Sequence, residues 1–238
     1  MFQHIVILTG SGISAESGIR TYRGDEGLWE GHRLEDVATP EAFLANPELV
    51  YRFYNERRQQ LQSPEIRPNA AHEAIARLQR EYRGGNVALI TQNVDNLHER
   101  AGSRQCWHMH GSLTRARCTA CNTERDWPGE LDASHACPAC KEVGTLRPDV
   151  VWFGEMPLGL DHIVEQVEHC DLFIAIGTSG VVYPAAGLVQ IARHQAGAHT
   201  ICLTLDPPAN EHEFQEYHQG PASELVPALV ERLLGMRE

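Results

Sequence analysis

Short apolar runs separated by polar and glycine-rich stretches organise the chain. Runs rich in β-branched and aliphatic residues predict buried strands at 5–8, 87–90, 150–153, 172–176 and 200–203. A shorter run predicts a further strand at 105–109. Apolar residues recur at helical spacing in the segments 40–62, 70–82, 184–195 and 222–234. The second of these helices is expected to start after an N-cap at Asn69 and to end at Gly84-Gly85.

The alternation of strands and helices predicts an α/β fold built on a doubly wound parallel sheet. Ligands of such sheets bind outside the carboxyl ends of the strands. Polar or glycine-rich clusters follow six of the predicted strands, near residues 10, 92, 110, 154, 177 and 204. Because the carboxyl ends of parallel strands meet at one edge of a sheet, we expect these clusters to form a single large site.

The first strand runs into a glycine turn that suits a phosphate-binding helix start. Gly10-x-Gly12-x-x-Ala15 fits the dinucleotide fingerprint, and the segment 13–17 is expected to open a helix. Such a turn alone is common, and no second strand ending in an acidic residue follows about 20 positions on. The polar, glycine-broken stretch 20–36 stands there instead. We therefore expect a long loop that folds over a bound dinucleotide.

Composition narrows the classes of function. The chain has 238 residues, 42% of them hydrophobic, which suffices for a sizeable core, and its net charge of −12 argues against a general nucleic-acid or anionic-membrane binder. No apolar run approaches the roughly 18 residues of a membrane-spanning helix. Met1 leads almost directly into the first strand, so no leader peptide is expected and a cytoplasmic location is predicted.

Four of the seven cysteines have the spacing of a zinc ribbon. Cys118-x-x-Cys121 and Cys137-x-x-Cys140 each place two thiolates on a tight turn, and together they complete a tetrahedron. Because four protein ligands leave no position for water, the predicted Zn²⁺ is structural. The remaining cysteines, which lie in or beside predicted strands, are expected to be core thiols: Cys106, Cys170 and Cys202.

Several motifs together resemble those of the sirtuins, the NAD-dependent protein lysine deacylases. They lie at 10–19 with Arg23, 91–98, 110–111, 153–155, 177–179 and 182–184, with the four zinc-ribbon cysteines between them. They follow the family's order over nearly the whole chain. The segments 19–23 and 150–155 look most similar to the bacterial CobB-type desuccinylase and deacetylase branch.

The resemblance implies a Rossmann-like NAD-binding domain and a smaller domain inserted into it. The expected large domain comprises residues 1–31, 71–112 and 148–238, and the small domain a helical insert at 32–70 and a zinc ribbon at 113–147. NAD and an acyl-lysine protein or peptide would meet in the cleft between them. The oligomeric state is left open, with a monomer as one option.

The resemblance also assigns catalytic and cofactor-binding roles. His110 would be the general base that activates a ribose hydroxyl, with Asn93 and Asp95 beside it, and the products would be free lysine, nicotinamide and O-acyl-ADP-ribose. Histidine suits this task because its unperturbed pKa lies near neutrality. Thr204 stands where the family commonly has an Asn that contacts the adenosine ribose. The implied cofactor-binding residues are Gly10, Ser11, Gly12, Ser14, Ala15, Glu16, Ile19, Tyr22, Arg23, Trp29, Gln92, Asn93, Val94, Asp95, Gly177, Thr178, Ser179, Thr204, Leu205, Asp206 and Ala222.

The implied substrate residues lie in two segments. Val151, Trp152, Phe153 and Gly154 would offer backbone for pairing with the peptide. Tyr54 and Arg57, three residues apart on one helix face, resemble the reader of acidic acyl groups in the desuccinylating branch. For an isolated pair, a core-edge tyrosine beside a solvated arginine would be the ordinary interpretation.

Three functions use the same predicted cofactor site. The leading prediction is an NAD-dependent deacylase that removes succinyl, malonyl and acetyl groups from lysine. A mono-ADP-ribosyltransferase and a non-catalytic sensor of NAD or ADP-ribose are the alternatives. The expected base His110 argues against the sensor, because binding alone needs no base.

Overall fold

The computed structural model describes residues 1–21, 28–29 and 32–235. Six strands, each parallel to its neighbours, form the main sheet in the order β11-β10-β9-β1-β4-β5. This arrangement confirms the predicted doubly wound α/β fold. The strands are β1 (His4–Thr9), β4 (Asn86–Thr91), β5 (Trp107–His108), β9 (Leu172–Ile176), β10 (His199–Thr204) and β11 (Glu216–Gln219).

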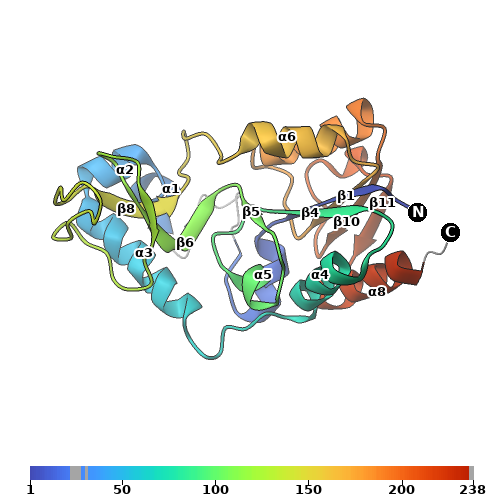
Figure 1. Cartoon of the computed structure of the whole chain (residues 1–238), viewed down its shortest axis with the longest axis horizontal. Coiled ribbons are helices and arrows are strands. Elements are labelled where there is room, and N and C mark those ends of the chain that lie inside the picture. Colours follow the sequence, from blue (N-terminus) through green and yellow to red (C-terminus); the bar gives the residue numbers. More distant parts are fainter. Residues whose placement is uncertain (22–27, 30–31, 236–238) are drawn as a thin grey trace.

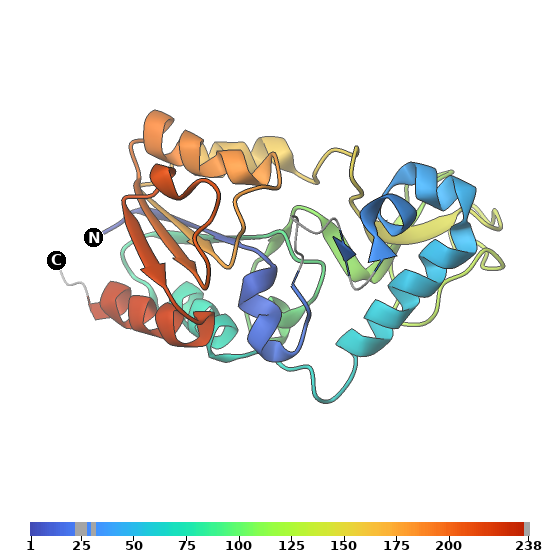
Figure 2. The same ribbon diagram turned by 180° about the vertical axis from the view of Figure 1, so that it is seen from behind.

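Helices cover both faces of the main sheet (Figures 1 and 2). Side chains of β1 point alternately to the two faces, with Ile5 and Ile7 in one apolar core and Val6 and Leu8 in the other. Both sets are buried, as is typical of a parallel sheet covered on two sides. The first core lies under α4 (Ala70–Glu81) and α8 (Ala222–Gly235), and the second under α6 (Leu160–Glu168), η3 (Ala185–Gly187), α7 (Leu188–Gln190) and η4 (Ile191–Gln195).

A smaller lobe lies beside the main sheet, on the left in Figure 1. We call it the small lobe, and the main sheet with its helices the large lobe. It combines three helices with a three-stranded antiparallel sheet of order β7-β6-β8. Its elements are α1 (Leu34–Val37), α2 (Pro40–Ala45), α3 (Pro47–Leu61), β6 (Gly111–Cys118), β7 (Glu124–Asp126) and β8 (Leu146–Val150).

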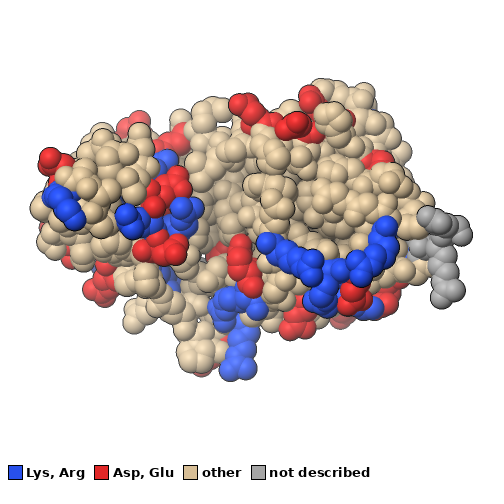
Figure 3. All heavy atoms as spheres, viewed as in Figure 1, with Lys and Arg blue, Asp and Glu red and all other residues tan. Residues whose placement is uncertain are grey.

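Short elements complete the chain. A two-stranded antiparallel pair, β2 (Leu28–Trp29) and β3 (His32–Arg33), precedes α1. Within the residues that the structure describes, the remaining short helices are η1 (Ser11–Ser17), α5 (Leu97–Arg100) and η5 (Glu211–Glu213). Across the part of the chain that the structure describes, no helix combines the length and apolar character needed to cross a membrane. On the face shown in Figure 3, basic side chains gather over α4 and acidic ones over α6.

The helix predicted at 70–82 is confirmed, since α4 covers Ala70–Glu81. Its N-cap is Asn69, whose side chain accepts the Ala71 N–H at 3.0 Å. His72 returns the contact, because its Nδ1 accepts the Asn69 N–H at 3.3 Å. The two contacts satisfy donors that the first turn of a helix leaves without intrahelical partners.

The strand predicted at 150–153 is wrong. β8 ends at Val150 and pairs with β6 in the small antiparallel sheet, so Gly154 does not follow a strand of the main sheet. The apolar run there instead covers the small lobe, where Val150 and Trp152 are buried among residues of the helical insert. Consequently five of the six predicted clusters, not six, follow strands of the main sheet.

Two predicted helices are interrupted. The segment 40–62 is split at Asn46, whose side chain accepts the Leu49 N–H at 3.1 Å and starts α3 with Pro47 in its first turn. The segment 184–195 is a succession of short helical pieces of different pitch. Hydrophobic spacing alone does not show either break, because the apolar residues continue across both.

Candidate active site

The point where the strand order reverses lies between β1 and β9, and the glycine turns after these strands meet there. Gly10 donates its N–H to the Ile176 carbonyl at 2.9 Å, and Gly12 donates to the Gly177 carbonyl at 3.0 Å. A Cβ on Gly10 or Gly12 would lie 2.7 Å from a backbone atom of Gly177, which itself has a φ of +61°. Backbone therefore packs directly on backbone at the position where doubly wound sheets bind dinucleotides.

Three polar side chains that the sequence predicts for NAD converge beside this turn. Asn93 Nδ2 donates to the Gly10 carbonyl at 3.1 Å and to Ser14 Oγ at 3.2 Å. Ser14 Oγ in turn donates to Asp95 Oδ2 at 3.0 Å. Asp95 also accepts the Leu97 N–H at 3.0 Å, so it caps α5 as well as joining the cluster. Burial raises the pKa of the Asp95 carboxyl, whereas these two hydrogen bonds lower it.

A buried histidine that the sequence analysis did not single out supports this cluster. His72 Nδ1 is an acceptor in the α4 cap, so Nε2 carries the proton and faces Ser14 Oγ at 3.5 Å. Burial lowers the pKa of His72 to about 4, which keeps the ring neutral at physiological pH. The signal in the sequence is the polar residue three positions after Asn69, a capping-box spacing that here also serves the site.

The second buried histidine, His98, lies beside a hydroxyl pair that joins β1 and β4. Thr9 Oγ1 donates to Thr91 Oγ1 at 2.8 Å, so the 3.0 Å contact with His98 Nε2 requires the ring to donate. Burial lowers the pKa of His98 well below its ordinary value, and the ring stacks edge-on against His72 with centroids 4.9 Å apart. Both imidazoles are therefore neutral, and they pack against each other beneath the site.

His110 follows β5, and its hydrogen bond fixes which ring nitrogen can accept a proton. Nδ1 lies 3.1 Å from the Gln92 carbonyl oxygen, and a carbonyl only accepts, so Nδ1 carries the hydrogen. Nε2 is then the basic nitrogen. Burial lowers the pKa of His110 below 6.5, although the bond to Gln92 raises it, so the ring is neutral at pH 7.

His108 differs from His110, because oxygen atoms face both of its ring nitrogens. Nδ1 lies 3.0 Å from the Asn93 carbonyl, and Nε2 lies 2.7 Å from Glu99 Oε1. Burial lowers the pKa of His108, but the bond to Glu99 and its charge outweigh burial and raise it overall. His108 therefore holds the backbone that presents Asn93.

Further predicted cofactor residues lie at the same edge. Glu16 on η1 accepts the N–H of Ser223, the residue after Ala222 at the start of α8, at 3.0 Å. Thr204, at the end of β10, donates to the Asp206 carbonyl at 2.7 Å. The turns after β4, β9 and β10 place the other members: Gln92, Val94, Thr178, Ser179 and Leu205. Ser11, Ala15 and Ile19 lie in or just after η1. Tyr22 and Arg23 lie outside the described residues, and of Trp29 only its backbone in β2 is described.

The two predicted substrate segments meet in the small lobe. Trp152 Nε1 donates to the hydroxyl of Tyr54 at 2.9 Å, and Tyr54 is fully buried. Arg57 stacks on the ring of Phe53 at 4.1 Å, and its Nη1 lies 3.0 Å from a Glu56 carboxylate oxygen. The Arg57 side chain is 13% exposed, so it is neither a core side chain nor a fully solvated one.

The predicted peptide-pairing segment lies directly beside His110. Val151 donates its N–H to the His110 carbonyl at 2.9 Å, and Phe153 donates to the Ala38 carbonyl at 3.0 Å. The Trp152 N–H goes to Glu155 Oε2 at 2.8 Å. Since these three N–H groups are used within the chain, an added peptide strand would have to donate to the carbonyls of this segment.

An arginine that the sequence analysis did not single out clamps this segment. Arg147 makes two hydrogen bonds to the Glu155 carboxylate, at 2.6 and 3.0 Å, and a third to the Val150 carbonyl at 2.8 Å. Its guanidinium also lies 3.3 Å from the centre of the Trp152 ring. The paired charges lower the pKa of Glu155 despite partial burial. A sequence shows no sign of such a clamp, because Arg147 lies outside the family motifs.

The four predicted zinc ligands come together. Their sulfur atoms all lie within 4.8 Å of one another, and Cys118–Cys140 and Cys121–Cys137 are each 3.7 Å apart. A tetrahedron with Zn–S bonds of about 2.3 Å has S–S edges of about 3.8 Å. The four cysteines therefore suit one Zn²⁺, and all four of its positions would be filled by protein.

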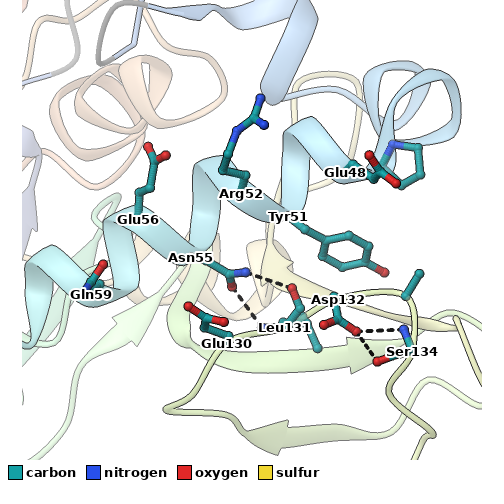
Figure 4. Close-up of a pocket in the computed structure, with 12 residues that line it drawn as sticks. Glu48, Tyr51, Arg52, Asn55, Glu56, Gln59, Glu130, Leu131, Asp132 and Ser134 are labelled. Atoms are coloured by element: carbon teal, nitrogen blue, oxygen red, sulfur yellow. Dashed lines mark hydrogen bonds between the residues drawn. The ribbon is translucent and has the colours of Figure 1, made fainter.

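One cavity lies away from the sheet edge. It has a volume of about 510 Å³ and separates α3 from residues 130–134 of the zinc ribbon (Figure 4). Asn55 closes its floor, donating to the Leu131 carbonyl at 2.9 Å and accepting the Leu131 N–H at 3.0 Å. None of the predicted site residues that the structure describes lines this cavity, so it belongs to the junction between helix and ribbon.

The glycine turns at the strand-order reversal and the polar cluster beside them define a nucleotide-binding α/β protein with a metal-stabilised small lobe. The Sir2 family model matches residues 10–184, and the chain belongs to this family. The resemblance that the sequence motifs suggested is thereby confirmed.

Curated relatives are similar over almost the whole chain. An NAD-dependent protein deacylase of Escherichia coli (strain K12) is 56% identical over 97% of this chain and 82% of its own length. The NAD-dependent protein deacylase SIR2rp3 of Trypanosoma brucei brucei is 58% identical over 97% of this chain and 94% of its own length.

Solved structures agree with the fold. A mutant Sir2 homologue in complex with ADP-ribose superposes with a TM-score of 0.88 at 42% identity, covering 98% of this chain and 92% of the homologue. A Sir2 homologue in complex with NAD gives 0.87 at 41% identity, covering 98% and 90%. A Sir2 complex with a p53 peptide and NAD⁺ gives 0.80 at 29% identity, covering 97% and 93%.

Proposed function

We propose that this protein is an NAD-dependent protein-lysine deacylase that removes succinyl, malonyl and acetyl groups. The names of its relatives support NAD-dependent deacylation, and the Sir2 complexes with NAD, ADP-ribose and a peptide support the ligands. The observation that carries the proposal is the contact between His110 Nδ1 and the Gln92 carbonyl. Because Nδ1 is committed to this carbonyl, a basic Nε2 is available beside the cofactor cluster.

NAD would be held at the reversal point between β1 and β9. The glycine turns after β1 and β9 pack backbone on backbone there, and Ser14, Asn93 and Asp95 would offer hydroxyl, amide and carboxylate groups to the ribose and nicotinamide of the cofactor. When bound, NAD would supply a ribose carbon from which nicotinamide can leave. The buried cluster fixes these three side chains before the cofactor arrives, so little reorganisation would be needed. Tyr22, Arg23 and Trp29 are proposed to cover the cofactor.

His110 would act on a ribose hydroxyl. A neutral imidazole accepts the proton at Nε2, and the Gln92 carbonyl stabilises the resulting cation through Nδ1. Asn93 and Asp95 would orient the hydroxyls rather than accept the proton. Asp95 is already occupied by Ser14 and the Leu97 N–H, whereas His110 Nε2 has the geometry of a base.

Tyr54 and Arg57 would select the acyl group. Tyr54 contacts Trp152, which adjoins Val151, whose N–H bonds to the His110 carbonyl. This short chain of contacts supports a placement of the acyl group between the base and α3. A succinyl or malonyl group ends in a carboxylate, and Arg57 can bind a carboxylate through two parallel hydrogen bonds. Glu56 would have to release Arg57 when such a substrate binds.

The proposed partners are acyl-lysine proteins, whose extended segment would lie along residues 151–154. The proposed cofactor-binding domain comprises 1–31, 71–112 and 148–238, with 32–70 and 113–147 inserted. β6 (Gly111–Cys118) runs across the limit between 112 and 113, and β8 (Leu146–Val150) across the limit between 147 and 148. A reducing compartment such as the cytoplasm suits a four-thiolate zinc site.

Mass spectrometry of a succinyl-lysine peptide incubated with the protein and NAD tests the proposal. A deacylase removes the mass of the succinyl group and forms an acylated ADP-ribose. A gain of ADP-ribose on a protein or peptide would instead indicate a transferase, and no change with any acyl group would leave a sensor.

A further inference from the structure

A second group of side chains that could ligate a metal joins α5 to the segment at β5, outside the zinc ribbon. It consists of Glu99, Cys106 and His108. We propose that these three residues form a transition-metal site at which Zn²⁺ binds and inhibits the enzyme. The inhibition rests on the proposed deacylase function, whereas the binding does not.

The three ligand atoms already converge. One carboxylate oxygen of Glu99, Cys106 Sγ and a ring nitrogen of His108 all lie within 4.8 Å of one another. Cys106 and His108 are two positions apart on an extended segment, so their side chains point to the same side of it. Glu99 comes from α5, a helix of four residues.

The second nitrogen of His108 is held as it is in known metal sites. Histidines that bind metals almost always donate their other N–H to a carbonyl or carboxylate, which fixes the ring and its tautomer. Here Nδ1 lies 3.0 Å from the Asn93 carbonyl, which presents Nε2 to Glu99 and Cys106. An ordinary ion pair between His108 and Glu99 would not need a thiol beside it.

The three types of ligand, and the room for Glu99 to move, suit Zn²⁺. Thiolate, imidazole and carboxylate are the three ligand types that Zn²⁺ uses, with bonds of about 2.0–2.3 Å and ligand edges of about 3.3–3.8 Å. Nε2 and Oε1 are now 2.7 Å apart, so Glu99 must move back slightly, and its side chain is 44% exposed. On binding, Zn²⁺ replaces the proton between His108 and Glu99 and the Cys106 thiol proton, and these protons pass to solvent. A water completes the tetrahedron.

Asn93 links the metal site to the proposed reaction centre. The carbonyl that His108 holds belongs to Asn93, whose side chain contacts Gly10 and Ser14 in the cofactor cluster. Drawing His108 toward a metal shifts its hold on this backbone and places a divalent charge near Asp95. We therefore expect bound Zn²⁺ to lower deacylation by misplacing Asn93.

The test uses protein whose four-cysteine site is loaded with zinc, titrated with a further equivalent of Zn²⁺ or Co²⁺. Wild type is expected to bind one additional ion, and Co²⁺ to show thiolate-to-metal charge-transfer absorption. Cys106→Ala should lose this absorption and weaken binding by at least about tenfold. Glu99→Gln, at an exposed position, should weaken binding while leaving the fold intact. Cys170→Ala, which removes a buried thiol elsewhere, is the matched control and should bind as wild type does.

Activity provides the second readout. Zn²⁺ should inhibit deacylation in wild type and Cys170→Ala but not in Cys106→Ala at the same concentration. Binding or inhibition that is equal in wild type and Cys106→Ala would overturn the proposal. If the protein proved not to be a deacylase, the Co²⁺ absorption and the metal stoichiometry would still decide whether the site exists.

Discussion

The two lobes use buried polar groups for different purposes. At the edge of the main sheet, the buried side chains of Ser14, Asn93 and Asp95 form hydrogen bonds among themselves and with the glycine turn. These are the side chains that we propose hold the cofactor. In the small lobe, the buried charges hold backbone. Arg58, which is 1% exposed, donates to the Leu113 carbonyl at 2.7 Å, and Arg147 holds the Val150 carbonyl and Glu155.

This difference follows from the size of the two cores. The large lobe has two continuous apolar cores under its helices. The small lobe divides its apolar residues between a cluster around Phe53 and Trp152 and a smaller one around Tyr51, Ala116 and Leu146, which the zinc ribbon shares. Burial lowers the pKa of the Arg58 guanidinium to about 10. The zinc ribbon, which has little apolar surface of its own, depends on a metal, and buried arginines tie it to the helical insert. The large lobe can reserve its buried polar groups for chemistry.

Loss of the structural zinc should therefore show the difference between the two lobes most strongly. Structural Zn²⁺ contributes about 10–16 kcal/mol in isolated zinc fingers, and here it links segments that have little core of their own. Cys137→Ser is expected to expose the amides of residues 119–145 to hydrogen exchange and to reduce deacylation by more than tenfold. The amides of β1, β4 and β9 should stay protected. Cys170→Ala serves as the control, and a metal-free protein with a protected ribbon and normal activity would contradict the account.

His110→Ala should lower turnover while leaving the binding of NAD at the sheet edge intact. A positioned base contributes about 10²–10⁴ to the rate, and turnover should fall by that factor. The thermal stabilisation by NAD should remain, since Ser14, Asn93 and Asp95 are untouched. Turnover by single-cycle kinetics and the melting temperature with and without NAD measure the two effects. His212→Ala removes an exposed ring far along the chain and should change neither. A mutant that keeps more than about a tenth of the turnover would exclude His110 as the base.

The pH profile should show a smaller effect. Burial lowers the pKa of His110 below 6.5, and the base must be neutral to act. Activity should then be present above this pKa and decline as the pH falls through it, so the acid limb of kcat/KM should have its midpoint below pH 6.5. An acid limb centred above pH 7 would mean that another group controls the step.

Much of the large lobe could be predicted from the sequence because its strands are short apolar runs buried on both faces. The strands at 87–90, 172–176 and 200–203 are confirmed to within one or two residues. β11 was missed, since Glu216, Tyr217, His218 and Gln219 form a polar edge strand with no apolar run. The segment 150–153 was misplaced because an apolar run does not reveal which sheet it joins.

The residues of the candidate site also fall into those that the sequence predicts and those that it does not. The glycine turn, Asn93, Asp95 and the zinc cysteines have fixed spacings that a sequence displays. The roles of His72 and His98 depend on contacts with residues 58 and 89 positions away in the sequence. The role of Arg147 depends on its guanidinium lying over the ring of Trp152. Only the folded chain reveals these contacts.

The central claim is that the large lobe performs the chemistry and the small lobe selects the acyl group. Arg57→Met keeps the length of the side chain and removes the charge, whereas Arg52→Met on the same helix is the matched control. A charge-assisted hydrogen bond contributes about 1.5–3 kcal/mol, or about 10- to 150-fold in kcat/KM. The measurement is the ratio of kcat/KM for succinyl-lysine and acetyl-lysine peptides. The account predicts that this ratio falls by that factor in Arg57→Met, through loss of succinyl turnover alone, and stays constant in Arg52→Met. An unchanged ratio in Arg57→Met would contradict it.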